Sequence, residues 1–336
     1  MDDIFSAKTT LVTGASGLLG GAVAKALLEA GHRVRAMARD PRRVEPLARQ
    51  GAEVVQADMI DPASLERAAS GCQVVLHFAG ALTGDFAGAD YFYQVNVEGT
   101  LHLARAALAA GVERFVHTSS AWVYGFDAGP GTNERSPYLV SDDAYIDTKI
   151  EAERRLQQLR LDSGLPLVIT QPSELYGPGD RHWTLIPLRF IQTGKMILVN
   201  GGSGLIHPIY VDDAVAGTLA AARRGRIGEA YLLYGPEVVS LKRFYAELAG
   251  MLGRKWIPSV PGWLARMLVA VMEGWSALTH RPPLFSRSVL RSNMMHASYD
   301  GGKAREELDF MPRVSLQAGM SAVSAWLAAE NPLDTS

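Results

Sequence analysis

Three glycines between an apolar run and an amphipathic stretch constrain the fold of this chain more than any other feature. Residues 9–13 predict a short buried strand, and residues 18–30 predict a helix. Gly14 permits a tight turn, Gly17 lets a pyrophosphate approach the backbone, and Gly20 lets the helix pack close to the strand. The free N–H groups at the start of the helix then face the anion. The pattern predicts a dinucleotide site, with an ordinary strand-to-helix loop as the alternative.

The apolar runs that follow alternate with helical patterns, which predicts a doubly wound parallel sheet of the α/β (Rossmann) class. A long alanine-rich helix is expected at residues 91–110. We expect residues 1–180 to form mainly the dinucleotide-binding domain, and residues 181–336 to form mainly a smaller substrate-binding part with some segments returning to the sheet. Strands are predicted at residues 9–13, 33–38, 53–57, 73–78, 113–119 and 167–171.

The second strand is followed by Arg39-Asp40-Pro41, at the position that discriminates between NAD and NADP. An acidic residue about twenty positions beyond the glycines holds the ribose 2′-hydroxyl of NAD, whereas an Arg suits the 2′-phosphate of NADP. An Asp directly before a proline also has the form of a helix N-cap. We therefore interpret Asp40 as structural and Arg39, with Arg42 or Arg43 as possible helpers, as the phosphate-binding residue. NADP is expected and NAD is the alternative.

Composition restricts the remaining choices. The chain has 336 residues, long enough for a large α/β core, and its 48% hydrophobic and 20% charged content is typical of a soluble protein. Lys plus Arg number 33 against 35 for Asp plus Glu, so no overall field recruits nucleic acid. Cys72 is the only cysteine, which excludes an internal disulfide and a thiolate zinc site; no metal is expected. Because residues 1–4 lack a secretory signal, we expect a cytoplasmic location.

The fifth predicted strand leads into hydroxyl-bearing residues at the carboxyl edge of the sheet, where ligands sit in this architecture. Ser120 can donate a hydrogen bond to a substrate oxygen. Asp142 or Asp143 then caps a helix containing Tyr145 and Lys149, which lie four residues apart on one face. A lysine charge beside the phenol would lower the pKa of the tyrosine toward neutrality. Such pairs also occur by chance in many helices.

Together, the glycine loop, the Ser120 element and Tyr145-x-x-x-Lys149 resemble the extended short-chain dehydrogenase/reductase family over essentially the whole chain. The resemblance implies that Tyr145 donates or accepts a proton, Lys149 also binds the nicotinamide ribose, and Ser120 orients the carbonyl. One departure is Gln171, where the family has Arg before the proline, and it puts the local packing in doubt. We assign these residues to cofactor binding: Gly14, Ser16, Gly17, Leu18, Leu19, Arg39, Asp58, Met59, Phe78, Ala79, Gly80, Thr118, Tyr145, Lys149, Pro172 and Leu175.

The second half of the chain bears on the substrate. Ile206 stands where sugar-nucleotide members of the family carry an Arg for the diphosphate, and the surrounding segment resembles 3β-hydroxysteroid dehydrogenase-like and dihydroflavonol reductase-like members. Asp212 and Asp213 resemble helix-capping residues rather than catalytic acids. Residues 260–278 form the most apolar stretch. Arg266 and Glu273 share one face of it, so we expect an amphipathic helix covering an apolar cleft, with a membrane-surface helix as the alternative and no transmembrane segment.

Three functions compete at this point. The first is an NADPH-dependent reductase of a ketone or aldehyde on an apolar small molecule, or the reverse alcohol oxidation. The second is a nucleotide-sugar epimerase or dehydratase of the same fold. The third is a non-catalytic NADP-sensing protein, although such proteins usually lose the tyrosine or the lysine. The family resemblance is compatible with a monomer or a homodimer pairing the helices around Asn96 and Lys149.

Overall fold

The computed structural model describes residues 3–82, 88–126, 128–141, 143–279 and 287–333, and for residues 273–279, 288 and 289 the backbone alone. The expectations for Asp142 and for the side chains of Glu273 and Trp275 lie outside these described residues.

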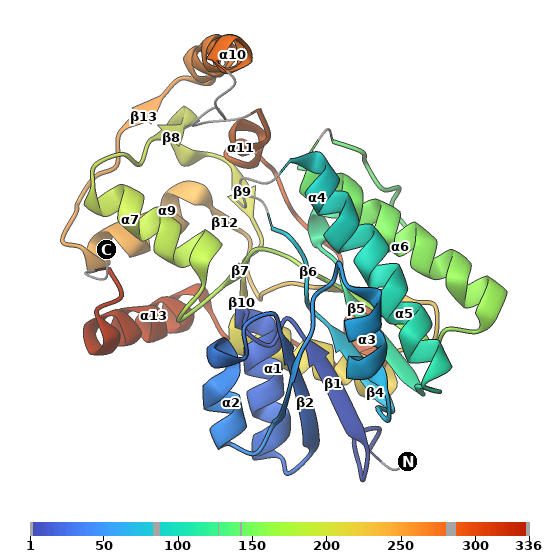
Figure 1. Cartoon of the computed structure of the whole chain (residues 1–336). Helices are drawn as coiled ribbons and strands as arrows, with labels where there is room; N and C mark the ends of the chain where they lie inside the picture. Colours follow the sequence, from blue (N-terminus) through green and yellow to red (C-terminus); the bar gives the residue numbers. More distant parts are fainter. Residues whose placement is uncertain (1–2, 83–87, 127, 142, 280–286, 334–336) are drawn as a thin grey trace.

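A parallel sheet of seven strands, in the order β11-β6-β5-β4-β1-β2-β3, forms the centre of the molecule (Figure 1). The six strands predicted from the sequence are all present. The seventh strand, β11, was not predicted and pairs with β6 from far along the chain. The strands are β1 (Thr9–Thr13), β2 (Arg33–Ala38), β3 (Glu53–Gln56), β4 (Val74–His77), β5 (Arg114–Thr118), β6 (Leu167–Pro172) and β11 (Ala230–Leu233).

Both faces of the sheet are buried because successive side chains of each strand point to opposite faces. Val12 packs against the layer that contains α1, α8 and α12, whereas the adjacent Leu11 packs against α3, α5 and α6. The predicted doubly wound α/β fold is therefore confirmed. The covering helices are α1 (Leu18–Glu29), α3 (Pro62–Ala69), α5 (Thr100–Ala109), α6 (Ala144–Ser163), α8 (Val211–Arg224) and α12 (Gly302–Leu308).

The strand order reverses between β1 and β4, because the chain proceeds from β1 to β2 and β3 in one direction and then returns to place β4 on the other side of β1. In open α/β sheets the crevice at such a reversal, outside the carboxyl ends of the strands, is where ligands bind. The glycine loop follows β1 and the Phe78-Ala79-Gly80 segment follows β4, so the topology brings these two predicted segments to one crevice.

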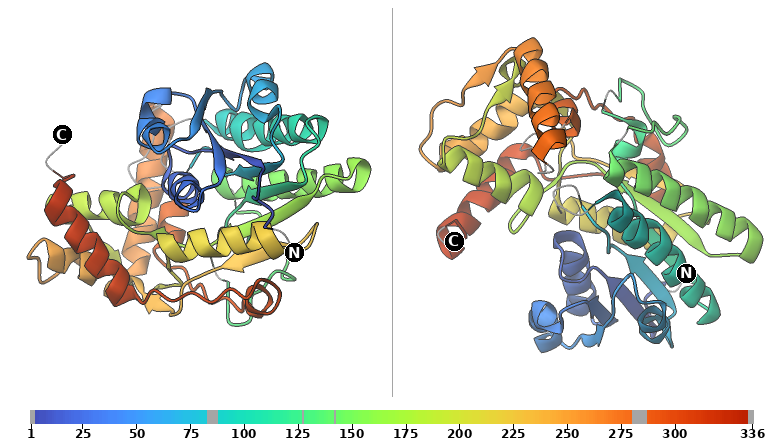
Figure 2. Two further views of the ribbon diagram at one scale, coloured as in Figure 1. Left: turned by 90° about the horizontal axis from the view of Figure 1, so that it is seen from below. Right: turned by 45° about the horizontal axis from the view of Figure 1, so that its top comes forward.

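A third hydrophobic cluster lies beyond this edge and holds the C-terminal elements against α6, the helix that carries Tyr145 and Lys149. Figures 1 and 2 show α7, α9, α10 and α13 grouped together, apart from the helices α3 to α5. The remaining elements are η1 (Pro41–Val44), α2 (Glu45–Arg49), α4 (Ala89–Tyr93), η2 (Gln94–Gly99), η3 (Ala121–Tyr124), β7 (Leu175–Tyr176), η4 (Arg181–Leu185), α7 (Ile186–Gln192), β8 (Leu198–Val199), η5 (Asn200–Gly202), β9 (Leu205–Ile206), β10 (Ile209–Tyr210), β12 (Val239–Ser240), α9 (Leu241–Met251), β13 (Ser259–Val260), α10 (Gly262–Thr279), α11 (Arg287–Ser292) and α13 (Leu316–Glu330).

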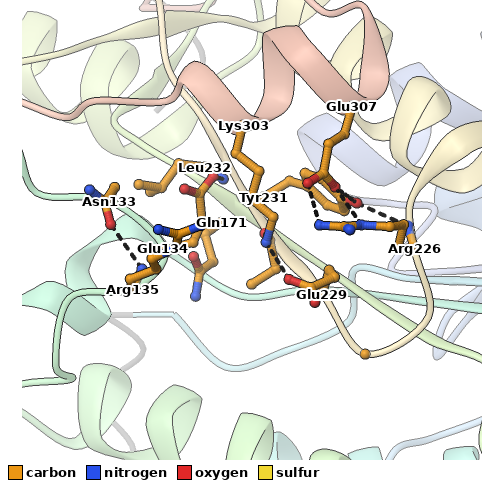
Figure 3. Close-up of polar contacts among 12 residues, drawn as sticks. Asn133, Glu134, Arg135, Gln171, Arg226, Glu229, Tyr231, Leu232, Lys303 and Glu307 are labelled. Atoms are coloured by element: carbon orange, nitrogen blue, oxygen red, sulfur yellow. Dashed lines mark hydrogen bonds and ion pairs between the residues drawn. The ribbon is translucent and has the colours of Figure 1, made fainter.

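Strand β11 lies at one edge of the sheet, where unpaired backbone groups would invite pairing with another chain. Side chains form hydrogen bonds with these backbone groups (Figure 3). The Leu232 N–H donates to Glu134 at 2.8 Å, and Lys303 donates to the Ala230 carbonyl at 2.8 Å and to Glu229 at 2.6 Å. We interpret this charged cluster as a closure of the sheet edge.

Of two local expectations, one is confirmed and one was wrong. The helix expected at residues 91–110 is present as one helical run of α4, η2 and α5, in which η2 is a π-helical turn. Asp213 does not cap α8; its carboxylate instead accepts the backbone N–H groups of Arg313 at 3.0 Å and Val314 at 2.9 Å. It thereby ties the chain before α13 to the start of α8. Asp143 caps α6, as predicted, and Ser315 caps α13.

Candidate active site

Gly14 and Gly20 of the glycine loop leave no room for a Cβ atom. Gly14 has φ +64°, and a Cβ atom there would lie 2.7 Å from the backbone nitrogen of Ala79. A Cβ on Gly20 would lie 2.8 Å from the Gly14 carbonyl carbon. The Gly17 N–H closes the turn by donating to the Gly14 carbonyl at 2.9 Å. The loop therefore presents bare backbone at the start of α1, which fits the pyrophosphate of a dinucleotide.

A buried histidine fastens this loop to the neighbouring strand. Thr13 Oγ1 accepts the N–H groups of Phe78 and Ala79, each at 3.2 Å, so its own proton goes to His77 Nδ1 at 2.7 Å. His77 Nε2 then carries the proton that reaches Thr100 Oγ1 at 2.9 Å. Burial lowers the pKa of His77 to about 3, so the ring is neutral and its tautomer is set by the two threonines.

One cavity of about 420 Å³ contains the glycine loop and all three predicted catalytic side chains. Five residues assigned to cofactor binding do not line it: Arg39, Asp58, Met59, Ala79 and Gly80. Gly80 nevertheless lies beside Lys149, because a Cβ atom added to Gly80 would lie 3.5 Å from the lysine Nζ. The predicted residues that line it are Gly14, Ser16, Gly17, Leu18, Leu19, Phe78, Thr118, Ser120, Tyr145, Lys149, Pro172 and Leu175.

The predicted catalytic residues come from two adjacent elements at the carboxyl end of β5. Ser120 caps η3, and its Oγ accepts the Trp122 N–H at 3.2 Å. Ser120 also lowers the pKa of Tyr145, which lies one turn before Lys149 on α6. Lys149 Nζ donates to the Thr118 carbonyl at 2.9 Å and lies 5.9 Å from the centre of the Tyr145 ring.

The expected lowering of the tyrosine pKa is wrong for this structure. Burial raises the pKa of Tyr145 to about 12, and its hydrogen bond with Ser120 only partly opposes the shift. Burial also lowers the pKa of Lys149 to about 8, with Glu153 opposing that shift. The loss of hydration therefore outweighs the lysine charge, which is directed at the Thr118 carbonyl.

Asn96 joins the cofactor side of the cavity to the catalytic helix. It lies in the π-turn η2, where its Oδ1 accepts the Ala81 N–H at 2.7 Å and its Nδ2 donates to Thr148 Oγ1 at 3.1 Å. Such π-turns are frequent at functional sites. Here the turn aims one buried amide at both the loop after β4 and α6, which fixes the position of Lys149 relative to that loop.

Aromatic side chains and a buried acid form the opposite wall. The Trp122 ring meets the Tyr145 ring edge to face at 6.4 Å and the Trp183 ring at 6.2 Å. The buried carboxylate of Glu174 accepts the indole N–H of Trp122 at 2.9 Å and the backbone N–H of His207 at 3.0 Å. Burial raises the pKa of Glu174. Trp122, Trp183 and Glu174 all line the cavity.

Gln171, the departure from the family pattern, is fully buried and well packed. Its Oε1 accepts the Tyr124 hydroxyl at 2.8 Å, and its Nε2 donates to Glu153 at 3.0 Å. Glu153 also accepts the Tyr138 hydroxyl, and burial raises its pKa. Hydrogen bonds from an amide and a phenol thus satisfy the carboxyl group of Glu153, which lies one turn beyond Lys149. An Arg in place of Gln171 would add a second buried cation beside Lys149.

Sequence reasoning missed the far wall because its members are distant along the chain. Trp122 stood next to the predicted serine, but only the folded chain brings Glu174 and Trp183 to it. Asp180 was also overlooked. It caps η4 by accepting the Trp183 N–H at 2.7 Å, and burial raises its pKa to about 6. Its position before a tryptophan could have signalled this cap.

The expected role of residues 260–278 as a cleft cover is wrong for the described side chains. None of those in α10 lines the catalytic cavity, and Met267, Leu268 and Val271 are exposed. Ile206, the position of the absent diphosphate cation, is fully buried in the third hydrophobic cluster. Within the part of the chain that the structure describes, no helix is long and apolar enough to cross a membrane.

The fold and this cavity define a dinucleotide-dependent enzyme class, and the comparison with known families agrees. Residues 10–233 match the model of the NAD dependent epimerase/dehydratase family. The chain therefore belongs to that family, and the predicted resemblance to the extended short-chain dehydrogenases/reductases is confirmed.

Related proteins of known name are reductases and dehydrogenases. A 2-alkyl-3-oxoalkanoate reductase of Shewanella oneidensis is 28% identical over 97% of this chain and 88% of its own length. A putative dihydroflavonol 4-reductase of Synechocystis is 31% identical over 94% and 95%. A 3β-hydroxysteroid dehydrogenase/Δ5→4-isomerase of Mycobacterium tuberculosis is 29% identical over 93% and 88%. The predicted class of enzyme, an NAD(P)-dependent oxidoreductase acting on carbonyl or hydroxyl groups, is confirmed.

Among solved structures, the dTDP-glucose 4,6-dehydratase of Streptomyces venezuelae with NAD bound superimposes with a TM-score of 0.80. It is 25% identical, and the match covers 96% of this chain and 98% of that one. The dinucleotide in this neighbour agrees with the predicted class of cofactor.

Proposed function

We propose that the protein is an NADPH-dependent reductase of a ketone or aldehyde on an apolar small molecule, with the reverse alcohol oxidation also open to it. The observation that carries this proposal is the single cavity in which Ser120, Tyr145 and Lys149 lie between the glycine loop and an aromatic wall. NADPH, when bound along the glycine loop, supplies the hydride.

The side chains then take distinct roles. Ser120 donates a hydrogen bond to the substrate carbonyl oxygen, and the Tyr145 hydroxyl transfers its proton to that oxygen as the carbon is reduced. The phenol of Tyr145 is protonated at neutral pH, so it carries the proton to be transferred. Lys149 holds the cofactor ribose and, by its charge, stabilises the phenolate left behind. Solvent protons then restore the phenol.

We also propose a preference for NADP(H). Asp40 is occupied as a helix cap, since its Oδ1 accepts the Arg42 N–H at 3.1 Å and its carboxylate pairs with the Arg42 guanidinium at 2.9 Å. Arg39 is exposed, and its guanidinium donates to the Tyr91 hydroxyl at 3.0 Å. Arg43 lines the cavity. These arginines are available to contact a 2′-phosphate, whereas Asp40 is not free to bind a ribose.

Calorimetric titration with NADPH and NADH tests this preference. A charge-assisted phosphate contact contributes on the order of 1.5 to 3 kcal/mol, so Arg39→Ala or Arg43→Ala should weaken NADPH binding about tenfold to a hundredfold and leave NADH binding unchanged. Arg49→Ala is the matched control, because Arg49 is an exposed arginine paired with Glu45 on α2. Equal affinities for both cofactors in the wild type would return Asp40 to the role of ribose ligand.

The apolar substrate is supported by Trp122 and Trp183 in the cavity wall and by the burial of Ile206 where sugar-nucleotide enzymes carry a cation. A diphosphate brought against these tryptophans would lose hydration, and the groups able to carry a positive charge that it could reach on this side of the cavity are Arg181 and His182. NADPH oxidation should be screened against carbonyl compounds of graded size and polarity, with NADH in parallel. Thermal stabilisation by UDP- or GDP-sugars at micromolar concentration would instead favour the epimerase or dehydratase. Cofactor binding with no turnover of any compound would favour an NADP-sensing protein.

Two further proposals concern organisation and location. Residues 1–180 supply the glycine loop and the catalytic groups, and residues 181–336 add Trp183 to the cavity, which supports a mainly cofactor-binding and a mainly substrate-binding part. Cys72, the only cysteine, is a free buried thiol, which supports a reducing, cytoplasmic compartment.

A further inference from the structure

The exposed side of α10 is apolar, which is unusual for a surface helix. Trp263, Met267 and Val271 follow one another at four-residue intervals, Leu268 lies beside them, and all four are exposed. Ala265 and Val269, on the other side of the same helix, are buried. A surface helix of a globular protein normally turns its polar face to water, so an apolar face turned outward indicates a surface that meets another apolar phase.

The helix is held in this orientation by the protein. The Gly262 N–H at its start donates to Asn200 Oδ1 at 2.6 Å, and β13, just before it, pairs with β8. This pairing also brings exposed Ile197, directly before β8, to the chain near Trp256, which is the most exposed of the large apolar side chains that the structure describes. We call this set of side chains the α10 surface: Ile197, Trp256, Trp263, Met267, Leu268 and Val271.

Most of the charged residues beside the α10 surface are basic. In residues 254–272 the charged residues are Arg254, Lys255 and Arg266, all exposed; Glu273 follows on α10, and its side chain lies outside the described ones. Tryptophan is enriched at membrane–water interfaces, and basic residues beside an apolar helix face attract anionic lipid headgroups. Figure 1 and the right-hand view of Figure 2 place α10 at the end of the molecule opposite β1 and α1, where a flat surface can reach it.

A groove beside α10 leads from the outside of the molecule toward the catalytic cavity. Arg266 lines a groove of about 340 Å³ together with the exposed Leu139 and Val140 and with buried Phe126. The Phe126 ring contacts Trp122, in the wall of the catalytic cavity, at 5.3 Å. Apolar side chains therefore extend from the outside of the molecule to the site.

We propose that the α10 surface docks the protein on an anionic lipid bilayer, with the apolar side chains in the headgroup region and Arg254, Lys255 and Arg266 against lipid phosphates. The bilayer covers a face that the described residues leave open, and among those residues no helix is long and apolar enough to cross it. This inference is independent of the proposed reaction, since it concerns a surface outside the catalytic cavity.

Co-sedimentation of the full chain with vesicles tests the proposal. The wild type should sediment with vesicles of phosphatidylcholine containing about one third phosphatidylglycerol, less with phosphatidylcholine alone, and less again in high salt. The variant Met267→Glu/Val271→Glu places acids on side chains that are 51% and 66% exposed, so the fold tolerates it. Its partition onto anionic vesicles should fall about tenfold or more.

A matched control carries the same added charge elsewhere. Ile227→Glu/Leu161→Glu replaces apolar side chains that are 47% and 67% exposed and lie outside the α10 surface. It should bind vesicles within about twofold of the wild type, as expected for a change of net charge alone. Absence of wild-type sedimentation with anionic vesicles, or equal loss in both variants, would overturn the proposal. If the wild type proves to be a dimer and Met267→Glu/Val271→Glu a monomer, the α10 surface would instead bind a second copy of the chain.

Discussion

The two walls of the catalytic cavity are built in different ways. The cofactor wall, which contains the glycine loop, is built mainly of backbone atoms. A Cβ on Gly14 or Gly20 would meet other backbone atoms, and Thr13 and His77 hold the loop through hydrogen bonds. On the opposite wall, side chains from η3, η4 and the segment after β6 meet, and Glu174 orients the Trp122 ring. A wall made of backbone tolerates few substitutions, whereas a wall made of side chains can change its ligand without changing the fold.

Replacing the group shared by both walls should have the largest effect. Tyr145→Phe keeps the ring that meets Trp122 and removes the transferable proton, so turnover should fall by about two to four powers of ten. The dissociation constant for NADPH should stay nearly unchanged, as measured by fluorescence titration. Retention of more than about a tenth of wild-type turnover would show that Tyr145 is not the proton donor.

On the cofactor wall, Gly14→Ala should cost about 2 to 4 kcal/mol of unfolding free energy and abolish tight NADPH binding, because it adds both backbone strain and a steric clash. Gly31→Ala is the matched control. Gly31 also has a positive φ, +81°, but a Cβ there meets nothing within 4 Å, so only the strain, about 1 kcal/mol, remains. Urea unfolding measures both. Equal losses in the two variants would mean that the close approach to Ala79 is unimportant.

Substitutions in the opposite wall, which faces the substrate, should change substrate specificity and leave cofactor affinity unchanged. Trp122→Ala should lower kcat/KM for the best apolar substrate about tenfold to a hundredfold, since a large aromatic surface is lost, while NADPH affinity is retained. Trp122→Phe keeps a ring and should recover most of the loss. If Trp122→Ala affected small and large carbonyl compounds alike, the wall would not select substrates.

The same contrast explains what the sequence could predict. The glycine loop, six strands and the Ser120, Tyr145 and Lys149 positions follow from local spacing, because φ, burial period and helix register are set by near neighbours. Glu174, Trp183 and Asn96 act through contacts between distant segments, and β11 is a short strand that pairs only after the chain returns. The face that α10 exposes and the direction of the Tyr145 pKa shift were both mistaken, because each depends on burial, which spacing alone does not fix.

The smallest expected effect concerns the buried charge of Lys149. Burial lowers its pKa from 10.5 to about 8, so between these values the unfolded chain binds more protons than the folded one. The unfolding free energy of the cofactor-free wild type should therefore rise with pH from about 8 toward 10, above which ionisation of tyrosines in the unfolded chain opposes the trend. Lys149→Met should remove this rise. At neutral pH it removes a buried cation at a gain of up to about 3 kcal/mol, offset by about 1 to 2 kcal/mol for the Thr118 carbonyl left without its donor.

The net expectation is a variant about 1 to 2 kcal/mol more stable than the wild type that binds NADPH more weakly. Urea unfolding across this pH range and calorimetric titration of NADPH measure the two quantities. Lys25→Met is the control, because Lys25 is an exposed lysine on α1 that pairs with Glu29 at 3.7 Å, and it should leave the pH dependence intact. A destabilised Lys149→Met protein would mean that the lysine supports the fold itself. A Lys149→Met protein that is more stable than the wild type and binds NADPH weakly would show that the lysine charge serves cofactor binding and lowers the stability of the fold.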